Sequence, residues 1–220
     1  MIRLHNLSKS YLVNGVRTVV ADGLNATFET RGATALLGRN GAGKSSLLRM
    51  IAGTMDPDDG QIVKTGRVSW PVGFAGSFHG DLSGAQNARF IARVQGVDTD
   101  EMLDAVARFT GLGAHFHTPV KTYSAGMRAR LAFAVSMAIP FDTYLVDEVT
   151  SVGDAEFKRK SEALFHERLQ HSGAIIVTHA LGLVQRLCDK AAVLDHGRLT
   201  FYTDIDQAIR HHQDLCRSHG

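Results

Sequence analysis

One octapeptide governs the interpretation of this chain, Gly38-Arg39-Asn40-Gly41-Ala42-Gly43-Lys44-Ser45. It matches the phosphate-binding pattern G-x-x-x-x-G-K-[ST], known as Walker A. The apolar run 33–37 before it predicts a buried strand, and the pattern of 45–52 after it predicts a helix. Glycines allow backbone N–H groups to turn toward phosphate oxygens, and a helix N-terminus adds the positive end of its dipole. We therefore expect Lys44 to reach the β- and γ-phosphates of a nucleotide and the Ser45 hydroxyl to ligate Mg²⁺.

Polar side chains follow two further predicted strands. Asp147 and Glu148 come directly after the apolar residues 144–146, and His179 follows the strand predicted for 174–177. Ligands of open α/β sheets bind at the carboxyl ends of the strands, so these side chains are expected on the nucleotide side. Asp147 is predicted to hold Mg²⁺, and Glu148 to activate the attacking water as a general base. His179 either contacts a γ-phosphate oxygen and orients that water, or has a structural role.

The rest of the pattern predicts an α/β fold with a mainly parallel sheet, because strands alternate with helices after Pro140. The first 70 residues are rich in short strands, with a hairpin of 62–63 and 68–70 around Thr65-Gly66. The middle of the chain is helical. The predicted helices are 88–94, 100–109, 127–139, 156–169, 181–188 and a terminal one at 206–215, whose His211 and His212 are expected, with His219, to face solvent.

Composition excludes several classes of protein. The 220 residues are 44% apolar and 21% charged, with 24 Lys and Arg against 22 Asp and Glu, and this net charge of +2 is too small for a dedicated nucleic-acid binder. Cys188 and Cys216 lack a metal-binding spacing and are expected to be reduced thiols of a cytosolic protein. We find no apolar run of membrane-spanning length and no signal peptide, so a membrane process would require a pore from another chain.

A fourth motif supplies a family resemblance. Tyr123-Ser124-Ala125-Gly126-Met127 opens a predicted helix between the loop and the two acids. This order of motifs resembles the ABC transporter nucleotide-binding subunits over essentially the whole chain. The resemblance implies a P-loop NTPase with a RecA-like core, an N-terminal antiparallel β lobe and an inserted helical lobe. It implies one domain over 1–220, with core and β lobe at about 1–82 and 141–220 and the helical lobe at about 83–140. A simple N-cap is the alternative reading of Ser124.

The same resemblance implies further roles. Tyr11 would stack on adenine, with a core or hairpin aromatic as the alternative. Asp154 would belong to the loop that meets the partner subunit, and the usual glutamine of the family's Q-loop is absent from 70–80. ATP and Mg²⁺ are the expected cofactors, with Lys44, Glu148 and His179 as catalytic residues and Ser45 and Asp147 as metal ligands. The residues expected to bind ATP are Tyr11, Gly38, Arg39, Asn40, Gly41, Ala42, Gly43, Lys44, Ser45, Ser46, Ser124 and Gly126.

Departures from the family consensus narrow the resemblance. Val72-Gly73-Phe74 followed by Phe78-His79, and the Asp-Glu-Val-Thr-Ser-Val-Gly-Asp run from Asp147, are similar to the polysaccharide-export branch, most of all to Gram-negative capsular polysaccharide export ATPases. This implies an ATPase that powers capsular polysaccharide export from the cytoplasmic face of the inner membrane, as a peripheral protein. The implied partners are a second copy sandwiching ATP, a separate permease and, through it, further capsule-export proteins. The polysaccharide itself and nucleic acids would not be contacted.

Alternatives remain from the sequence alone. The cargo could be O-antigen or another glycan. A soluble, non-transport ABC-type ATPase acting on ribosomes or DNA is a rival of another class, although these commonly join two ATPase units in one chain. A P-loop nucleotide kinase or GTPase would need an arginine-rich lid or a guanine-reading Asn-Lys-x-Asp, which we do not find. Apolar and aromatic side chains expected at a permease contact are Trp70, Phe74, Phe78 and Phe90.

Overall fold

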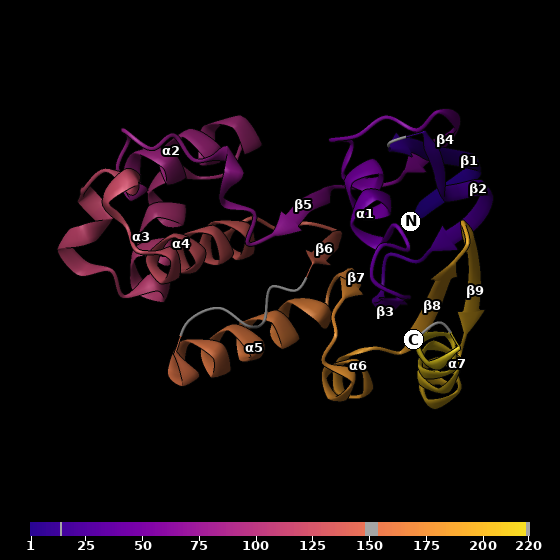
Figure 1. The fold of residues 1–220 in the computed structure, drawn as a ribbon. Helices are drawn as coiled ribbons and strands as arrows, with labels where there is room; N and C mark the ends of the chain where they lie inside the picture. Colours follow the sequence, from indigo (N-terminus) through magenta and orange to yellow (C-terminus); the bar gives the residue numbers. More distant parts are fainter. Residues whose placement is uncertain (14, 148–153, 219–220) are drawn as a thin grey trace. The chain divides into compact units, whose positions relative to one another are not determined.

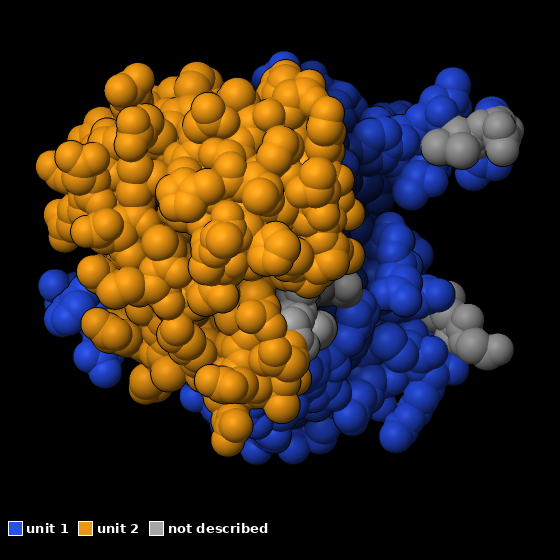
Figure 2. All heavy atoms as spheres, turned by 90° about the vertical axis from the view of Figure 1, so that its left-hand side faces the viewer, with its two compact units in different colours: residues 1–71, 141–148, 169–220 blue, residues 72–140, 149–168 orange. Residues whose placement is uncertain are grey.

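The computed structural model describes residues 1–13, 15–147 and 154–218 (Figure 1). The chain divides into two compact units, coloured separately in Figure 2. Unit 1 comprises residues 1–71, 141–148 and 169–220, and unit 2 comprises residues 72–140 and 149–168. Each unit is described on its own below.

Unit 1 opens with a three-stranded antiparallel sheet in the order β2-β1-β4. Its strands are β1 (Ile2–Val13), β2 (Val16–Phe28) and β4 (Asp59–Lys64). Alternate residues point to opposite faces of a strand, and one face here supplies the buried side chains of Ile2, Leu4 and Phe28. The predicted N-terminal antiparallel lobe is therefore confirmed.

The second sheet of unit 1 has six strands in the order β5-β6-β7-β3-β8-β9. They are β3 (Gly32–Leu37), β5 (Val68–Val72), β6 (Thr143–Asp147), β7 (Gly173–Val177), β8 (Lys190–Asp195) and β9 (Arg198–Tyr202). Pairs β6·β7, β7·β3 and β3·β8 are parallel, whereas β8·β9 is antiparallel. Every residue of β7 is buried, as expected of a central parallel strand covered on both faces. The mainly parallel sheet agrees with the fold class expected from the sequence.

The predicted hairpin around Thr65-Gly66 is wrong. Its first strand, β4, pairs with β1 in the antiparallel sheet, whereas its second, β5, lies next to β6 in the six-stranded sheet. The chain after Gly66 is held to β6 by specific contacts. The Arg67 N–H donates to the Asp142 carboxylate at 2.6 Å, and the Leu145 N–H donates to Ser69 Oγ at 2.8 Å.

Three described helices belong to unit 1 together with these sheets: α1 (Lys44–Ala52), α6 (Leu181–Leu187) and α7 (Ile205–Arg217). The terminal helix is confirmed, but the prediction that His211 and His212 face solvent is wrong. His211 and His212 are half-buried, and His211 Nδ1 lies 2.8 Å from the Tyr202 hydroxyl of β9. Ala208 and Ile209 are buried, so α7 is docked on the sheet rather than free. His219 lies outside the described residues.

Unit 2 is helical, and helices are present where the sequence predicted them at 88–94, 100–109 and 127–139. It contains α2 (Gly84–Gln95), α3 (Thr99–Thr110) and α4 (Ala125–Ala138), with the short 3-10 turns η1 (Ala75–Ser77), η2 (Gly113–His117) and η3 (Val120–Thr122), and it includes most of α5 (Ala155–Leu169). Ser83 forms a capping box with Gln86 at the start of α2. Asp98 is the N-cap of α3, and its carboxylate accepts the Glu101 N–H at 2.8 Å.

Helix α4 is the central helix of this unit. All seven residues from Leu131 to Met137 are buried, which is typical of a helix enclosed by neighbours rather than amphipathic at a surface. Among the described residues, no helix is both long enough and apolar enough to cross a bilayer.

Candidate nucleotide-binding site

The glycine-rich loop connects β3 to α1 at the carboxyl edge of the parallel sheet, in agreement with the strand and helix predicted on its two sides. Gly43 is the N-cap of α1 and has φ = 103°, in the region that favours glycine. A Cβ atom there would clash with Val20 Cγ1 of β2, and one at Gly38 would clash with the Leu194 carbonyl oxygen of β8. Gly38 and Gly43 therefore pack too closely on their neighbours to be replaced by a residue with a side chain. Helix α1 begins without a side-chain cap. Such an uncapped N-terminus is suited to an anion.

Lys44 folds back over this loop. Its ammonium donates to the Gly38 carbonyl oxygen at 2.7 Å and to the Arg39 carbonyl oxygen at 2.9 Å, and only 9% of the residue is exposed. The lysine is thus bonded to the first two residues of the loop. Because the partners are backbone carbonyls, its positive charge is not neutralised by them.

A pocket of about 580 Å³ surrounds the loop, within the size range of small-molecule sites. It brings together residues from three motifs predicted separately: the loop, the strand-end acid and the strand-end histidine. Its lining residues are Tyr11, Thr18, Val20, Asn40, Gly41, Gly43, Lys44, Ser45, Ser46, Asp147, Val177 and His179. The β6·β7 register pairs Asp147 with Val177, which explains how side chains over 30 positions apart reach one site. Glu148 lies outside the described residues.

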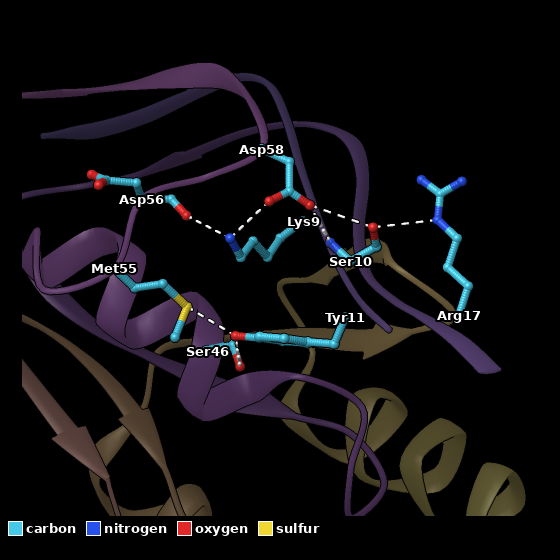
Figure 3. A network of polar contacts seen from close by, with 8 residues as sticks. All are labelled: Lys9, Ser10, Tyr11, Arg17, Ser46, Met55, Asp56 and Asp58. Carbon is cyan, nitrogen blue, oxygen red and sulfur yellow. Dashed lines mark hydrogen bonds and ion pairs between the residues drawn. The ribbon is translucent and has the colours of Figure 1, made fainter. Parts of the chain in front are cut away.

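Tyr11 forms one wall of this pocket and is held from its hydroxyl end. The hydroxyl oxygen lies 3.2 Å from Ser46 Oγ and 3.0 Å from Met55 Sδ, both on or beside α1 (Figure 3). The ring is half-buried, so one part packs on the protein and another faces the pocket.

The residues just before Tyr11 are fixed by Asp58 (Figure 3). Its carboxylate forms an ion pair with Lys9 at 2.7 Å and accepts the Ser10 N–H at 2.7 Å. The hydrogen bond from Lys9, followed by that from Ser10, lowers the pKa of Asp58 below its usual value, so the carboxylate is ionised at neutral pH. These contacts fix the backbone of β1 at the two residues that precede Tyr11.

Ser124 and Gly126 belong to unit 2 and line a pocket of their own. Ser124 is the N-cap of α4, and its hydroxyl oxygen accepts the Met127 N–H at 3.2 Å, so the alternative of a helix cap is realised. This pocket of about 440 Å³ also includes His115, Met127, Arg130 and Asp154. A capping hydroxyl at a helix N-terminus remains accessible to an anion that can replace this local bond.

Several contributors to these two pockets were not anticipated from the sequence. Thr18 and Val20 line the first pocket from β2, and no pattern in the sequence distinguishes them from other strand residues. Arg130 lines the second pocket, and its spacing of four residues from Gly126 on a predicted helix was a signal that could have found it.

His212 of α7 lies outside the two lists of pocket-lining residues but is affected by Lys44 of the loop. Burial lowers the pKa of His212, and the positive charge of Lys44 adds to this effect. Among the described residues, no group of three or more His, Cys, Asp or Glu side chains could hold a metal ion.

A glycine-rich loop between a buried strand and a helix, at the carboxyl edge of a mainly parallel sheet, defines a P-loop nucleotide-binding fold. A family model described as "ABC transporter" matches residues 21–151, and the chain belongs to that family. It is 44% identical to the polysialic acid transport ATP-binding protein KpsT of Escherichia coli, covering 98% of this chain and 99% of that one. It is 42% identical to the capsule polysaccharide export ATP-binding protein CtrD of Neisseria meningitidis serogroup B, over 98% and 100% of the two chains.

The fold is similar to solved structures of more distant relatives. A dimeric ATP-binding cassette in a post-hydrolysis state, bound to ADP and Pi, superimposes with a TM-score of 0.76 at 18% identity. The match covers 92% of this chain and 98% of that one. At this identity the likeness establishes the ABC ATPase fold.

Proposed function

We propose that this chain is the ATP-hydrolysing subunit of an ABC exporter that moves capsular polysaccharide across the inner membrane through a separate permease. The observation that carries the proposal is the match to two capsule-export ATP-binding proteins, at 42% and 44% identity from end to end. A match confined to the phosphate loop and the strand-end acids would support ATP hydrolysis alone. A match that also extends over the helical unit and α7 supports the same class of cargo as well.

The pocket around Lys44 supplies the groups that ATP requires. Tyr11 stacks on the adenine ring, the loop amides and Lys44 bind the phosphates, and the 38–46 segment contributes the remaining contacts. The Ser45 hydroxyl and the Asp147 carboxylate are oxygen ligands of the kind Mg²⁺ prefers, and both line the pocket. When bound by these two residues, Mg²⁺ would supply positive charge beside the phosphates during hydrolysis.

Hydrolysis itself needs a base and a group that holds the water. Glu148 follows Asp147 in the sequence and is proposed to accept the proton of the attacking water. His179 lies on the same edge of the sheet and is proposed to contact the γ-phosphate. The site is completed by a second copy, whose Ser124 and Gly126 at the start of α4 would bind the same γ-phosphate with a hydroxyl and helix amides.

The permease contact is proposed for unit 2, which exposes large apolar side chains. Phe74 is 54% exposed, Phe90 61% and Val94 64%. Phe90 and Val94 are four residues apart on α2 and therefore share one face. Of the other two residues expected there, Phe78 is half-buried and Trp70 packs edge-on against Phe141 at 5.4 Å within unit 1. Phe74 and Phe90 are thus the stronger candidates for anchors on a membrane partner at the cytoplasmic face.

Export is the measurement that tests this function. The gene would be deleted in its own bacterium, and polysaccharide would be quantified at the cell surface and inside the cell. We expect surface polysaccharide to be lost and intracellular polymer to accumulate, with rescue by the wild-type gene and not by Lys44→Ala. Phe90→Ser should fail to restore export while its purified protein still hydrolyses ATP.

A matched control for the apolar face is Val63→Ser. Val63 is 47% exposed on β4 of unit 1, and its replacement should restore export fully. Normal surface polysaccharide in the deletion strain would contradict the proposed cargo. Loss of ATP hydrolysis by Phe90→Ser would contradict its assignment to the permease contact.

A further inference from the structure

Strand β1 has only one partner strand at the point where it carries Tyr11. Among the described residues, its pairing with β4 ends at Ser8, whereas its pairing with β2 continues to the hairpin. The pairing with β2 is itself irregular here, with a register shift on each side of Lys9. Such irregularities interrupt the ladder of backbone hydrogen bonds. Strand pairing therefore leaves the orientation of Tyr11 to be fixed by other contacts.

Asp58 supplies contacts on the side where β4 ends. Strand β4 begins at the next residue, and the Asp58 N–H donates to the Ser8 carbonyl oxygen at 2.8 Å. Two positions further along β1, the Ser10 N–H donates to the Asp58 carboxylate at 2.7 Å. The backbone and the side chain of one residue therefore bind β1 at two points just before Tyr11.

Lys9 is held by the same carboxylate. Its ammonium forms an ion pair with Asp58 at 2.7 Å and donates to the Asp56 carbonyl oxygen at 2.9 Å, and only 16% of the side chain is exposed. The ammonium lies 5.8 Å from the centroid of the Tyr11 ring, within the range of cation–π attraction. In Figure 3 the ring is seen nearly edge-on, with Lys9 and Asp58 on one side of it. Asp58 thus acts on the Tyr11 ring through the Lys9 side chain and through the backbone of Ser10.

The hydroxyl of Tyr11 fixes only the far end of the ring. Its partners are Ser46 Oγ at 3.2 Å and Met55 Sδ at 3.0 Å, and a thioether sulfur is a weak acceptor. Stacking depends on the orientation of the ring plane and not only on the position of one atom. A ring that presents one face to a base must therefore also be held at its backbone end, where the contacts of Asp58 lie.

We infer that Asp58 is a positioning residue for the nucleobase. By binding the Ser10 N–H and the Lys9 ammonium, it fixes the orientation in which the Tyr11 ring meets adenine. The inference rests on the stack between Tyr11 and adenine under the proposed function. Loss of the carboxylate should weaken recognition of the base and spare that of the phosphates, because Asp58 binds β1 and lies outside the residues that line the pocket.

The test compares ATP with a ligand that lacks the base. Asp58→Ala is made in the full chain, and affinities for ATP and for inorganic tripolyphosphate are measured by competition against a fluorescent ATP analogue. Tyr11→Ala should weaken ATP binding roughly 5- to 150-fold, the range for loss of one aromatic–base stack. Asp58→Ala should show part of this loss, at least about threefold, because the stack is misaligned rather than removed. Its affinity for tripolyphosphate should equal that of the wild type.

Three further variants make the test specific. Asp58→Asn keeps an oxygen that can accept the Ser10 N–H but loses the charge of the ion pair, so its ATP affinity should lie between those of the wild type and Asp58→Ala. Asp58→Ala/Tyr11→Ala should bind ATP like Tyr11→Ala alone, because both lack the same stack. Glu29→Ala removes another ion pair of unit 1, Lys190–Glu29 at 2.7 Å, and should bind both ligands as the wild type does.

Three outcomes overturn the inference. They are a wild-type ATP affinity in folded Asp58→Ala, a tripolyphosphate affinity that falls in step with the ATP affinity, and losses that multiply in the double variant. The second would give Asp58 a general structural role, and the third would separate it from Tyr11. If Asp58→Ala does not fold, the same comparisons with Asp58→Asn decide the question.

Failure of the proposed base stack has a different signature. In that case Tyr11→Ala itself binds ATP with the affinity of the wild type, whatever the behaviour of Asp58→Ala. A Tyr11→Ala protein that binds ATP weakly, beside an Asp58→Ala protein that binds it normally, contradicts the role of Asp58 alone.

Discussion

The Lys44 ammonium donates to the carbonyl oxygen of Gly38, six residues earlier, at 2.7 Å. This bond holds the side chain against the loop that it is proposed to serve. A bound phosphate would compete with backbone carbonyls for the same ammonium, and a charged acceptor makes the stronger hydrogen bond. We therefore expect the Lys44 ammonium to leave the loop carbonyls and bind the phosphate when a nucleotide is present.

Lys44→Ala tests this assignment. A hydrogen bond to a charged group is worth about 1.5–3 kcal/mol, so ATP affinity should fall by roughly 10- to 150-fold in a titration with a fluorescent ATP analogue. Lys64→Ala is the matched control, because Lys64 donates to the Ile51 carbonyl oxygen at the opposite end of α1. It should bind ATP normally. Equal affinities for wild type and Lys44→Ala would remove Lys44 from the phosphate site.

Tyr11 should act through its ring rather than its hydroxyl. Tyr11→Ala should weaken ATP binding by about 1–3 kcal/mol, the usual value of an aromatic–base stack. Tyr11→Phe loses only the contacts with Ser46 and Met55, so its affinity should remain close to that of wild type. Isothermal titration calorimetry measures the affinity of both variants for ATP. The wild type should bind ATP and GTP similarly, because stacking contacts the face of the base and not the polar groups at its edge. A Tyr11→Ala protein that is folded and binds ATP normally would assign Tyr11 a structural role only.

The loop and the sheet edge could be predicted because their signals are local. The glycine spacing of 38–45 and the apolar runs before Asp147 and His179 each specify an element and its end, and parallel pairing then brings those ends together. The hairpin at 62–70 failed for the opposite reason. Two short apolar runs around a glycine do not reveal that one strand pairs with β1 and the other joins β6, since that choice depends on residues 75 positions away such as Asp142.

Contacts between side chains of distant elements were also beyond sequence reasoning. Arg130 and Asp154, which form an ion pair, are 24 positions apart, and each has an ordinary local explanation, a helix residue and an N-cap. Likewise, a run of polar residues at 210–214 is typical of a solvated helix, yet packing of α7 on β8 half-buries His211 and His212. In both cases the decisive information is tertiary packing.

The two thiols should differ sharply in reactivity. Burial, assisted by the negative charge of Asp189, raises the pKa of Cys188 to about 12, whereas Cys216 is exposed on α7. The thiolate is the reactive form, and at pH 8 only roughly one Cys188 in 10⁴ would be ionised. We expect a disulfide reagent to titrate one thiol rapidly in the native protein and the second only after unfolding in guanidinium chloride. Cys216→Ser should abolish the rapid phase, and two rapid thiols in the wild type would contradict the burial of Cys188.

The last prediction concerns the proposed base and the sandwich together. Glu148→Gln keeps the size of the side chain but removes the proton acceptor, and loss of a general base typically costs about 10²- to 10⁴-fold in rate. ATP binding should survive, because Lys44, Ser45 and Asp147 are unchanged. Since hydrolysis is proposed to open the sandwich, the variant should accumulate as an ATP-bound dimer in size-exclusion chromatography with light scattering.

A second substitution shows whether that dimer is joined at the start of α4. A Cβ atom at Gly126 would have no neighbour closer than Ser124 Oγ at 3.9 Å, so a side chain fits there in the single chain without strain. Adding Gly126→Asp to Glu148→Gln places an anion against the opposite γ-phosphate and should return the protein to monomers with ATP and Mg²⁺ present, whereas Gly126→Ala, which adds no charge, should leave it dimeric. If Glu148→Gln alone stays monomeric at high concentration, isolated subunits do not form a stable sandwich. If Glu148→Gln hydrolyses ATP at the wild-type rate, Glu148 is not the general base, because glutamine cannot accept the proton in its place.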